Sequence, residues 1–371
     1  MPQRGVIFSA VLGAMTWASG SAASAQTVNY TTPGVYSYTV PAGVQALDVD
    51  LAGGGGGSGT GVNIQIGIQG FDGLFPGGSG GDGARLTARV AVVPGNVISI
   101  TVAAGGGGGE DDQNAATPLN GGAGGAGAGS GGRSADGTKR DEPEPITSVY
   151  TAGGGGGASA VQMAGNFYLR AGGGGGGSSA TYGQSSRDLG ISGQSAPLAM
   201  ANTPDCGTPA NGGDGLAPTD VYTGGGSTIG TGAGGGGGYL NNAGAGGASA
   251  AGTVPDGTNW WTVNATPPTS ATGGGSCYYT ASVAYAISNP LVAVGAPGAI
   301  VDPGTLPLSP GTDGPLVALN GADGWVRITP VQGSVTPAVT SVPTMGTGSL
   351  ALLTLALAGV GALSSRAKRR R

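Results

Sequence analysis

Histidine is absent from the 371 residues, and charged residues make up only 9% of them. Without imidazole, the chain can form neither a Ser-His-Asp triad nor a Cys-His dyad, and it cannot hold a metal through histidine. Paired carboxylates remain available for acid–base chemistry, but they fall in no recognisable catalytic motif. The sequence therefore predicts a protein that is not an enzyme and needs no cofactor.

Aromatic residues are also scarce, at 5%, whereas glycine contributes 84 residues. This glycine lacks the strict three-residue period of collagen, and the low charge argues against a highly charged disordered chain. A core made of side chains would be small for this length, so backbone packing must supplement it. The formal net charge is −5. Five of the 14 basic residues lie in the last six positions. The rest of the chain is therefore clearly acidic, which disfavours nucleic acid as a partner.

Long glycine runs recur along the chain. The five longest occupy residues 53–57, 105–109, 153–157, 172–177 and 234–238. Each could be a flexible linker or an ordered polyproline-II-like rod. Ordering five glycines costs about 5–10 kcal/mol of backbone entropy. A net hydrogen bond returns only about 0.5–1.5 kcal/mol, so an ordered run needs several neighbours. Similar lengths and strand-like flanks favour order. We therefore predict a mainly β fold with a polyglycine-II helix bundle.

Strand-like segments precede the first two runs. Residues 34–41 and 44–51 alternate apolar and polar side chains around a Pro-Ala-Gly turn, which predicts a hairpin. Residues 84–93 and 97–102 predict a second pair around Pro-Gly-Asn. In the first pair Asp48 and Asp50 fall on the face opposite the apolar residues, either as a solvated face or as a cation site. Arg85 and Arg89 likewise fall on the wet face of the second pair.

The two ends of the chain carry export signals. Residues 1–25 combine Arg4, an apolar stretch and Ala23-Ser24-Ala25, which predicts a cleaved signal peptide; a short buried helix is the alternative. Residues 346–365 are apolar and uncharged, and the basic residues 366–371 follow them. This order predicts a transmembrane helix with a cytoplasmic tail. A body over residues 26–330 and a linker over 331–345 complete the predicted organisation.

Immediately before the apolar stretch lies Val342-Pro343-Thr344-Met345. A short motif followed by an apolar helix and a basic tail resembles bacterial C-terminal sorting signals of the exosortase type, in the variant whose motif reads Ile-Pro-Thr-Leu. Val342 and Met345 depart from that motif, and the aromatic residue often found after it is absent. The resemblance implies an envelope sorting protease as a partner. A permanent membrane anchor is the alternative.

The body has a resemblance of its own. Residues 36–44, with Tyr36, Tyr38 and Pro41, and residues 321–328, with Trp325, resemble the opening and closing strands of a bacterial glycine-rich domain. The body also resembles the glycine-rich region of anaplastic-lymphoma-kinase-type receptors, in which polyglycine-II helices pack beside strands. Both resemblances imply an extracellular structural or recognition module, and neither carries catalytic residues to this chain.

Two small clusters could carry specific chemistry. Cys206 and Cys277 are the only cysteines, and export to an oxidising compartment predicts a disulfide between them; two buried thiols are the alternative. Glu110, Asp111 and Asp112 are consecutive, so they could attract Ca²⁺, although contiguous carboxylates lack the alternating spacing of known calcium loops. An exposed polar loop is the simpler interpretation.

The late aromatic residues are candidate binding residues. Trp260, Trp261, Tyr278 and Tyr279 could stack on sugar rings or anchor a protein partner if exposed, and they would cap the core if buried. Taken together, the sequence predicts an exported structural or adhesive protein of the bacterial cell surface or extracellular matrix, processed at its C-terminal signal. The alternative is a lectin-like or receptor-binding module that recognises a glycan or a surface protein.

Overall fold

The computed structural model describes residues 26–66, 71–112, 119–137, 148–182, 187–188, 190–216, 228–247, 251–253, 264–266, 269–300 and 318–332. The chain divides into two units, Met1–Val331 and Gln332–Arg371. The predicted signal peptide and the predicted apolar and basic segments at the C-terminus lie outside the described residues.

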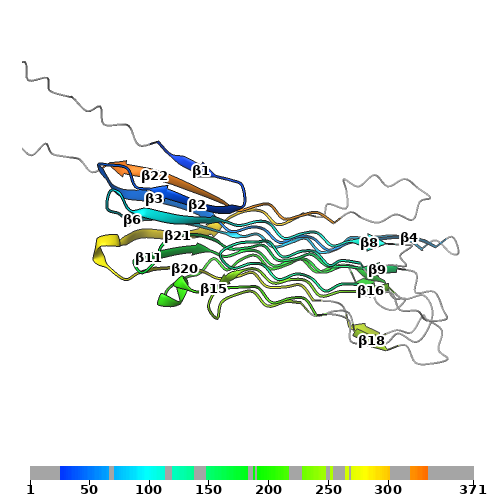
Figure 1. The fold of residues 1–371 in the computed structure, drawn as a ribbon. Helices are drawn as coiled ribbons and strands as arrows, with labels where there is room; N and C mark the ends of the chain where they lie inside the picture. The colour runs from blue at the N-terminus through cyan, green and yellow to red at the C-terminus, as the bar shows by residue number, and fades with distance from the viewer. Residues whose placement is uncertain are drawn as a thin grey trace, which may run out of the picture. The chain divides into compact units, whose positions relative to one another are not determined.

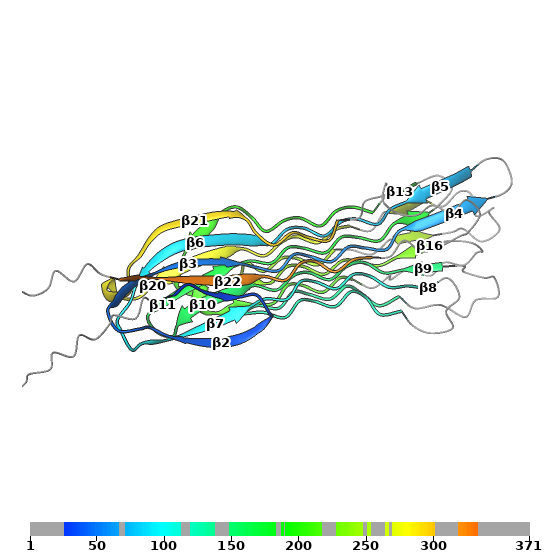
Figure 2. The ribbon, with the colours of Figure 1, turned by 90° about the horizontal axis from the view of Figure 1, so that it is seen from above.

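Two β-sheets pack face to face in the first unit (Figures 1 and 2). Sheet A has the strand order β1-β22-β3-β6-β21, with β1 at Val28–Tyr30, β3 at Val44–Ala52, β6 at Ala84–Ala91, β21 at Ile287–Val294 and β22 at Trp325–Gln332. Sheet B has the order β14-β20-β11-β10-β7-β2, with β2 at Gly34–Thr39, β7 at Val97–Val102, β10 at Ser159–Met163, β11 at Phe167–Ala171, β14 at Met200–Asn202 and β20 at Ser276–Thr280.

The core lies between these sheets. Alternation turns Leu47, Leu51 and Leu86 of sheet A inward, and they meet Ile98 and Leu169 of sheet B. All five are almost fully buried. Burying an aliphatic side chain of this size contributes about 1.5–3 kcal/mol. The predicted apolar face of residues 44–51 is therefore confirmed as a core face.

The two predicted hairpins are wrong. β2 pairs with β7 and β3 pairs with β6, both antiparallel, so each predicted pair is split between the sheets. The turns at residues 41–43 and 94–96 cross from one sheet to the other. The physical reason is the core: a hairpin would place the two apolar faces side by side in one sheet, whereas the crossing lets them face each other.

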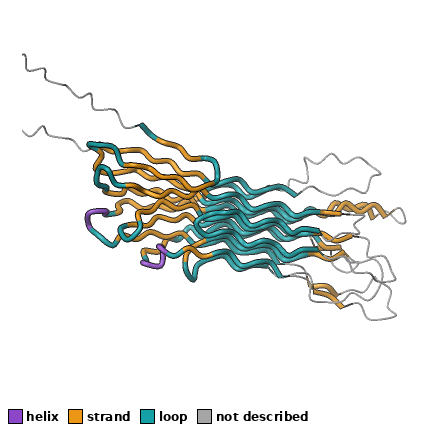
Figure 3. The backbone as a smooth tube through the Cα atoms, in the orientation of Figure 1, coloured by secondary structure: helices purple, strands orange, loops and turns teal. Residues whose placement is uncertain are grey.

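The glycine runs continue from the strands and lie side by side, as the loop segments of Figure 3 show. Runs 53–57, 153–157 and 172–177 bond one another in a cycle. The N–H of Gly54 donates to the carbonyl of Gly157 at 2.9 Å, Gly156 to Gly174 at 2.8 Å, and Gly174 to Gly54 at 2.9 Å. The same three runs repeat these bonds three residues along, through Gly57, Gly153 and Gly177. Each run thus finds the several neighbours that its order requires.

The predicted fold class is nevertheless wrong. The structure is mainly β, and no helix bundle is present among the described residues. The helical elements assigned there are the 3₁₀ turns η1 (Pro204–Gly207) and η3 (Val283–Tyr285). The glycine runs are loop segments whose hydrogen bonds pass sideways to other runs, whereas an α-helix would bond along its own chain.

No helix in the described part of the chain is both long and apolar enough to cross a membrane. The fold class also included a transmembrane helix over residues 346–365, and that segment lies outside the described part.

Short strands lie at the ends of the glycine runs that point away from the two sheets (Figures 1 and 3). They are β4 (Val62–Ile66) with β5 (Phe71–Phe75), β8 (Asp111–Asp112) and β16 (Thr228–Gly230) on either side of β9 (Ser148–Tyr150), β12 (Thr181–Tyr182) with β13 (Arg187–Asp188), and β18 (Ala251–Thr253) with β19 (Asn264–Thr266). A further pair joins β15 (Pro209–Ala210) to β17 (Gly238–Tyr239).

Candidate functional site

The outer face of sheet A carries a concave basin of about 550 Å³. Five charged side chains line it: Asp48 and Asp50 from β3, Arg85 and Arg89 from β6, and Arg327 from β22. The alternation that buries the leucines of β3 and β6 turns these residues outward, since successive side chains of a strand point to opposite faces. We call this surface the arginine basin.

Asp50 is the centre of the basin. Arg85 donates from Nε to Oδ1 and from Nη2 to Oδ2, each at 2.8 Å. Arg327 donates from Nη2 to Oδ2 at 2.7 Å. The Asp50 side chain is only 10% exposed. A buried carboxylate that accepts two hydrogen bonds from one arginine is strongly oriented, and it fixes both guanidinium groups in turn.

Asp48 forms the second ion pair. Arg89 donates from Nε and Nη2 to its two carboxylate oxygens at 2.6 and 2.9 Å. The hydrogen bond from Arg89 lowers the pKa of Asp48, and the same bond raises the pKa of Arg89. Both side chains are close to half exposed, so solvent weakens the pair. The sequence predicted that Asp48 and Asp50 form either a solvated face or a cation site. In the structure, arginine side chains bind both carboxylates.

The remaining lining mixes polar residues with the apolar Val49, Ala88 and Leu291. It includes the hydroxyls of Thr27, Thr87 and Thr329, the side chain of Asn289, and Leu291. Thr27 and Thr329 bond each other at 3.1 Å between their hydroxyl oxygens. Arginines of the basin can donate hydrogen bonds to a ligand, and its hydroxyl and amide groups can both donate and accept them. This combination suits a polar ligand with a negative charge.

Sequence reasoning missed this basin. It did place Asp48, Asp50, Arg85 and Arg89 on outward faces, and opposite charges at matching positions of two strands are a usable signal for pairing. However, the predicted hairpins assigned these strands to other partners. Arg327 falls within residues 321–328, the predicted closing strand, and no local pattern links it to Asp50.

The predicted disulfide is present. Cys206 of η1 and Cys277 of β20 are bonded, with their Cα atoms 5.6 Å apart. Both are fully buried, and Tyr239 packs against them. Closing a loop of 71 residues contributes about 4 kcal/mol in the chain-entropy treatment.

Arg170 of β11 lies beside Cys277 on the neighbouring strand β20, with which it pairs in register. It is 2% exposed and donates from Nη1 to the carbonyl of Gly238 at 3.5 Å. Burial lowers its pKa to about 10. Its long aliphatic stem therefore packs between sheet B and the segment around Gly238. The cost is a positive charge that water solvates poorly.

The candidate aromatic residues do not form one exposed group. Tyr278 packs against the main core, whereas Tyr279 packs against the disulfide cluster. Both are half-buried, as expected for residues that cap the core. Trp260 and Trp261 lie outside the described residues, so their proposed binding role stays a prediction.

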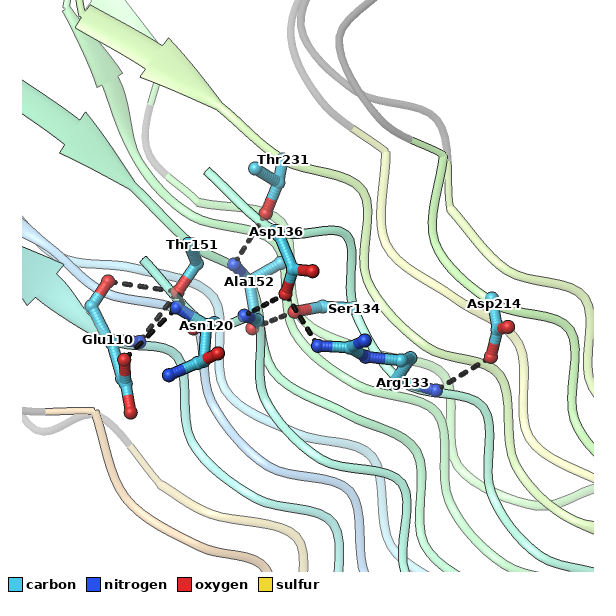
Figure 4. A network of polar contacts seen from close by, with 10 residues as sticks. Glu110, Asn120, Arg133, Ser134, Asp136, Thr151, Ala152, Asp214 and Thr231 are labelled. Carbon is cyan, nitrogen blue, oxygen red and sulfur yellow. Dashed lines mark hydrogen bonds and ion pairs between the residues drawn. The ribbon is translucent and has the colours of Figure 1, made fainter. Parts of the chain in front are cut away.

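The candidate calcium residues lie where a glycine run ends. Glu110 follows run 105–109, and one of its carboxylate oxygens accepts the N–H of Asn120 at 3.1 Å (Figure 4). Asp111 and Asp112 form β8. The structure describes their backbone and not their side chains. No group of three potential metal ligands occurs among the side chains that are described. The cation site at residues 110–112 stays a prediction.

Figure 4 shows what the polar side chains do at these ends of the glycine runs. The hydroxyl of Ser134 donates to the carbonyl of Ala152 at 2.6 Å, and the hydroxyl of Thr231 accepts the N–H of Ala152 at 2.9 Å. Asp214 accepts the N–H of Arg133 at 2.9 Å. Side-chain oxygens thus add to the backbone hydrogen bonds at these positions, which keeps buried peptide groups satisfied.

The predicted sorting motif at residues 342–345 lies outside the described residues. No known protein-family model matches the chain, and no curated protein matches it either. The class of protein is therefore defined by the fold itself, a β-sandwich whose strands continue into a hydrogen-bonded layer of glycine runs, with the arginine basin on its outer face.

Proposed function

We propose that this chain is an exported bacterial protein of the cell surface or extracellular matrix, with a structural and adhesive role. The observation that carries the proposal is the cycle of hydrogen bonds among runs 53–57, 153–157 and 172–177. Backbone groups, which carry no charge and need no cofactor, hold this layer together. A scaffold of this kind is suited to holding loops and a sheet face outward.

Two further features support export. The buried Cys206–Cys277 disulfide is typical of proteins that fold in an oxidising compartment. The resemblances of residues 1–25 to a signal peptide and of residues 342–345 to an exosortase-type motif agree with that compartment. We further propose that an envelope sorting protease cleaves the chain near Val342-Pro343-Thr344-Met345, and that no nucleic acid is a partner.

Processing can be tested in the bacterium that encodes the chain. A C-terminal epitope tag should be lost from the mature protein, and mass spectrometry should place the new C-terminus near residues 342–345. We expect Pro343→Ala to retain the tag, because the rigid proline is the most restrictive part of the motif. Pro337→Ala, in the same linker, is the matched control and should be processed normally. A mature wild-type protein that keeps its tag would contradict the proposal.

The alternative function is a lectin-like or receptor-binding module. One observation favours it: the arginine basin is a concave site whose arginines remain accessible, with Arg89 49% and Arg327 50% exposed. A recognition role and a structural role are compatible in one surface protein.

A further inference from the structure

We propose that the arginine basin binds sugars that carry a carboxylate, the uronic-acid units of acidic polysaccharides. The inference rests on the proposed adhesive function and deepens it, because it gives the adhesion a chemical target. Four properties of the basin lead to this ligand: its share of the cations, the geometry of its arginines, its net charge and its polar lining.

The first property is the concentration of positive charge. The structure describes the side chains of five arginines, and three of them line the basin. Of the other two, Arg170 is buried and Arg133 is paired with Asp136 elsewhere. In a chain with only 9% charged residues, this clustering gives one face of the described unit a cationic character.

The second property is the state of the arginines. Asp48 and Asp50 hold the guanidinium groups in place, but they do not use all of the donors. A guanidinium has five N–H donors. Among the described residues, Arg327 uses one of them on Asp50 and Arg89 uses two on Asp48. Because both side chains are half exposed, the remaining donors can meet a ligand without breaking the existing pairs. An oriented fork of this kind matches a carboxylate.

The third property is the charge balance. Three arginines and two aspartates leave the basin with a net charge of 3 − 2 = +1. One uronate carboxylate neutralises this charge. A group with two negative charges would leave an excess beside Asp48 and Asp50, so the balance favours a monoanionic unit.

The fourth property is the rest of the lining. Thr27, Thr87, Thr329 and Asn289 offer hydroxyl and amide groups for sugar hydroxyls, and Leu291, which is 67% exposed, offers apolar contact for the face of a sugar ring. A volume of about 550 Å³ lies within the range of small-molecule sites. The same lining would suit a small peptide less well, because Leu291 is the one large apolar side chain of the lining that is exposed.

The test is calorimetric titration of the full chain with trigalacturonate, with its methyl ester as the uncharged probe of nearly equal shape. We expect saturable binding of the acid and at least about tenfold weaker binding of the ester, since the charge-assisted bonds would be lost. Arg327→Gln and Arg89→Gln should each weaken binding of the acid by about tenfold. Arg327→Gln leaves the two bonds between Arg85 and Asp50 in place, so it should fold normally.

Arg133→Gln is the matched control, because Arg133 is also half exposed and also paired with an aspartate, but lies outside the basin. It should bind the acid like the wild type. The inference would be overturned if the wild type shows no saturable binding, if the ester binds as well as the acid, or if both basin variants bind like the control. These outcomes leave the C-terminal processing experiment unaffected, so failure of the ligand and failure of the proposed function can be told apart.

Discussion

Tyr38 shows how burial acts on a single residue of this fold. It lies in β2 opposite Ile98 of β7 and is 8% exposed. Its hydroxyl has no hydrogen-bond partner among the described residues. Burial raises its pKa, and the nearby Tyr30 raises it further. Tyr36, two residues earlier in the same strand, instead donates its hydroxyl to the carbonyl of Thr32 at 2.8 Å.

We predict that Tyr38→Phe stabilises the fold by about 1 kcal/mol at neutral pH, because it removes an unpaired buried hydroxyl. Tyr36→Phe should instead destabilise it by about 1 kcal/mol through the lost bond. The contribution of Tyr38 also depends on pH. Since its folded pKa lies above the unfolded value of about 10, this contribution is complete below pH 10 and is lost as the pH rises through the folded pKa.

Urea unfolding at neutral pH and above pH 10 checks this prediction. The free energy of unfolding of the wild type should fall more steeply with rising pH than that of Tyr38→Phe. Equal pH dependence of the two proteins would show that folding does not raise the pKa of Tyr38. A large loss of stability in Tyr38→Phe at neutral pH would show that its hydroxyl is paired.

At the scale of elements, the glycine runs replace side-chain packing with contact between backbones. A Cβ built on Gly156 would lie 2.1 Å from the carbonyl oxygen of Gly54, a distance that no real Cβ contact shows. At Gly275 the nearest atoms are instead side-chain atoms of Asn242 and Tyr239, at 3.0 and 3.1 Å. Both glycines are buried, so they differ mainly in whether backbone or side chain must move.

We therefore predict that Gly156→Ala destabilises the fold by about 3 kcal/mol or more, at the upper end of overpacking effects, because the neighbouring run cannot move aside alone. Gly275→Ala should cost about 1 kcal/mol, since side chains can adjust. Urea unfolding of both variants measures the difference. Comparable small losses for the two would mean that the runs are not packed against one another.

Much about the individual strands can be predicted from the sequence, and their pairing cannot. Alternation identified the buried face of residues 44–51 and the wet face that carries Arg85 and Arg89. The short turns at 41–43 and 94–96 suggested hairpins, but the demand that apolar faces meet across a core decided the pairing. The arginine basin could not be predicted for the same reason, because it depends on which strands are neighbours. Arg327 reaches Asp50 across 277 residues of sequence, and local patterns carry no information on such a pairing.

At the scale of the described unit, the chain passes without a break from the strands of the sandwich into the glycine layer and on to the short strands. β3 and β11 each lead into a glycine run, and the runs bond one another before the chain turns back. The disulfide covers one sheet of this unit and the arginine basin occupies the outer face of the other. The composition predicted that backbone packing must supplement the core. It could not reveal which runs bond to one another, because all glycines are identical in a sequence pattern.

Amide hydrogen exchange of the full chain tests most directly the claim that the glycine runs are a hydrogen-bonded scaffold. We predict that the amides of runs 153–157 and 172–177 exchange about 10⁴-fold or more slowly than in the denatured chain, at rates similar to those of β10 and β11. Exchange at the denatured rate throughout both runs, while β10 and β11 stay protected, would contradict the account.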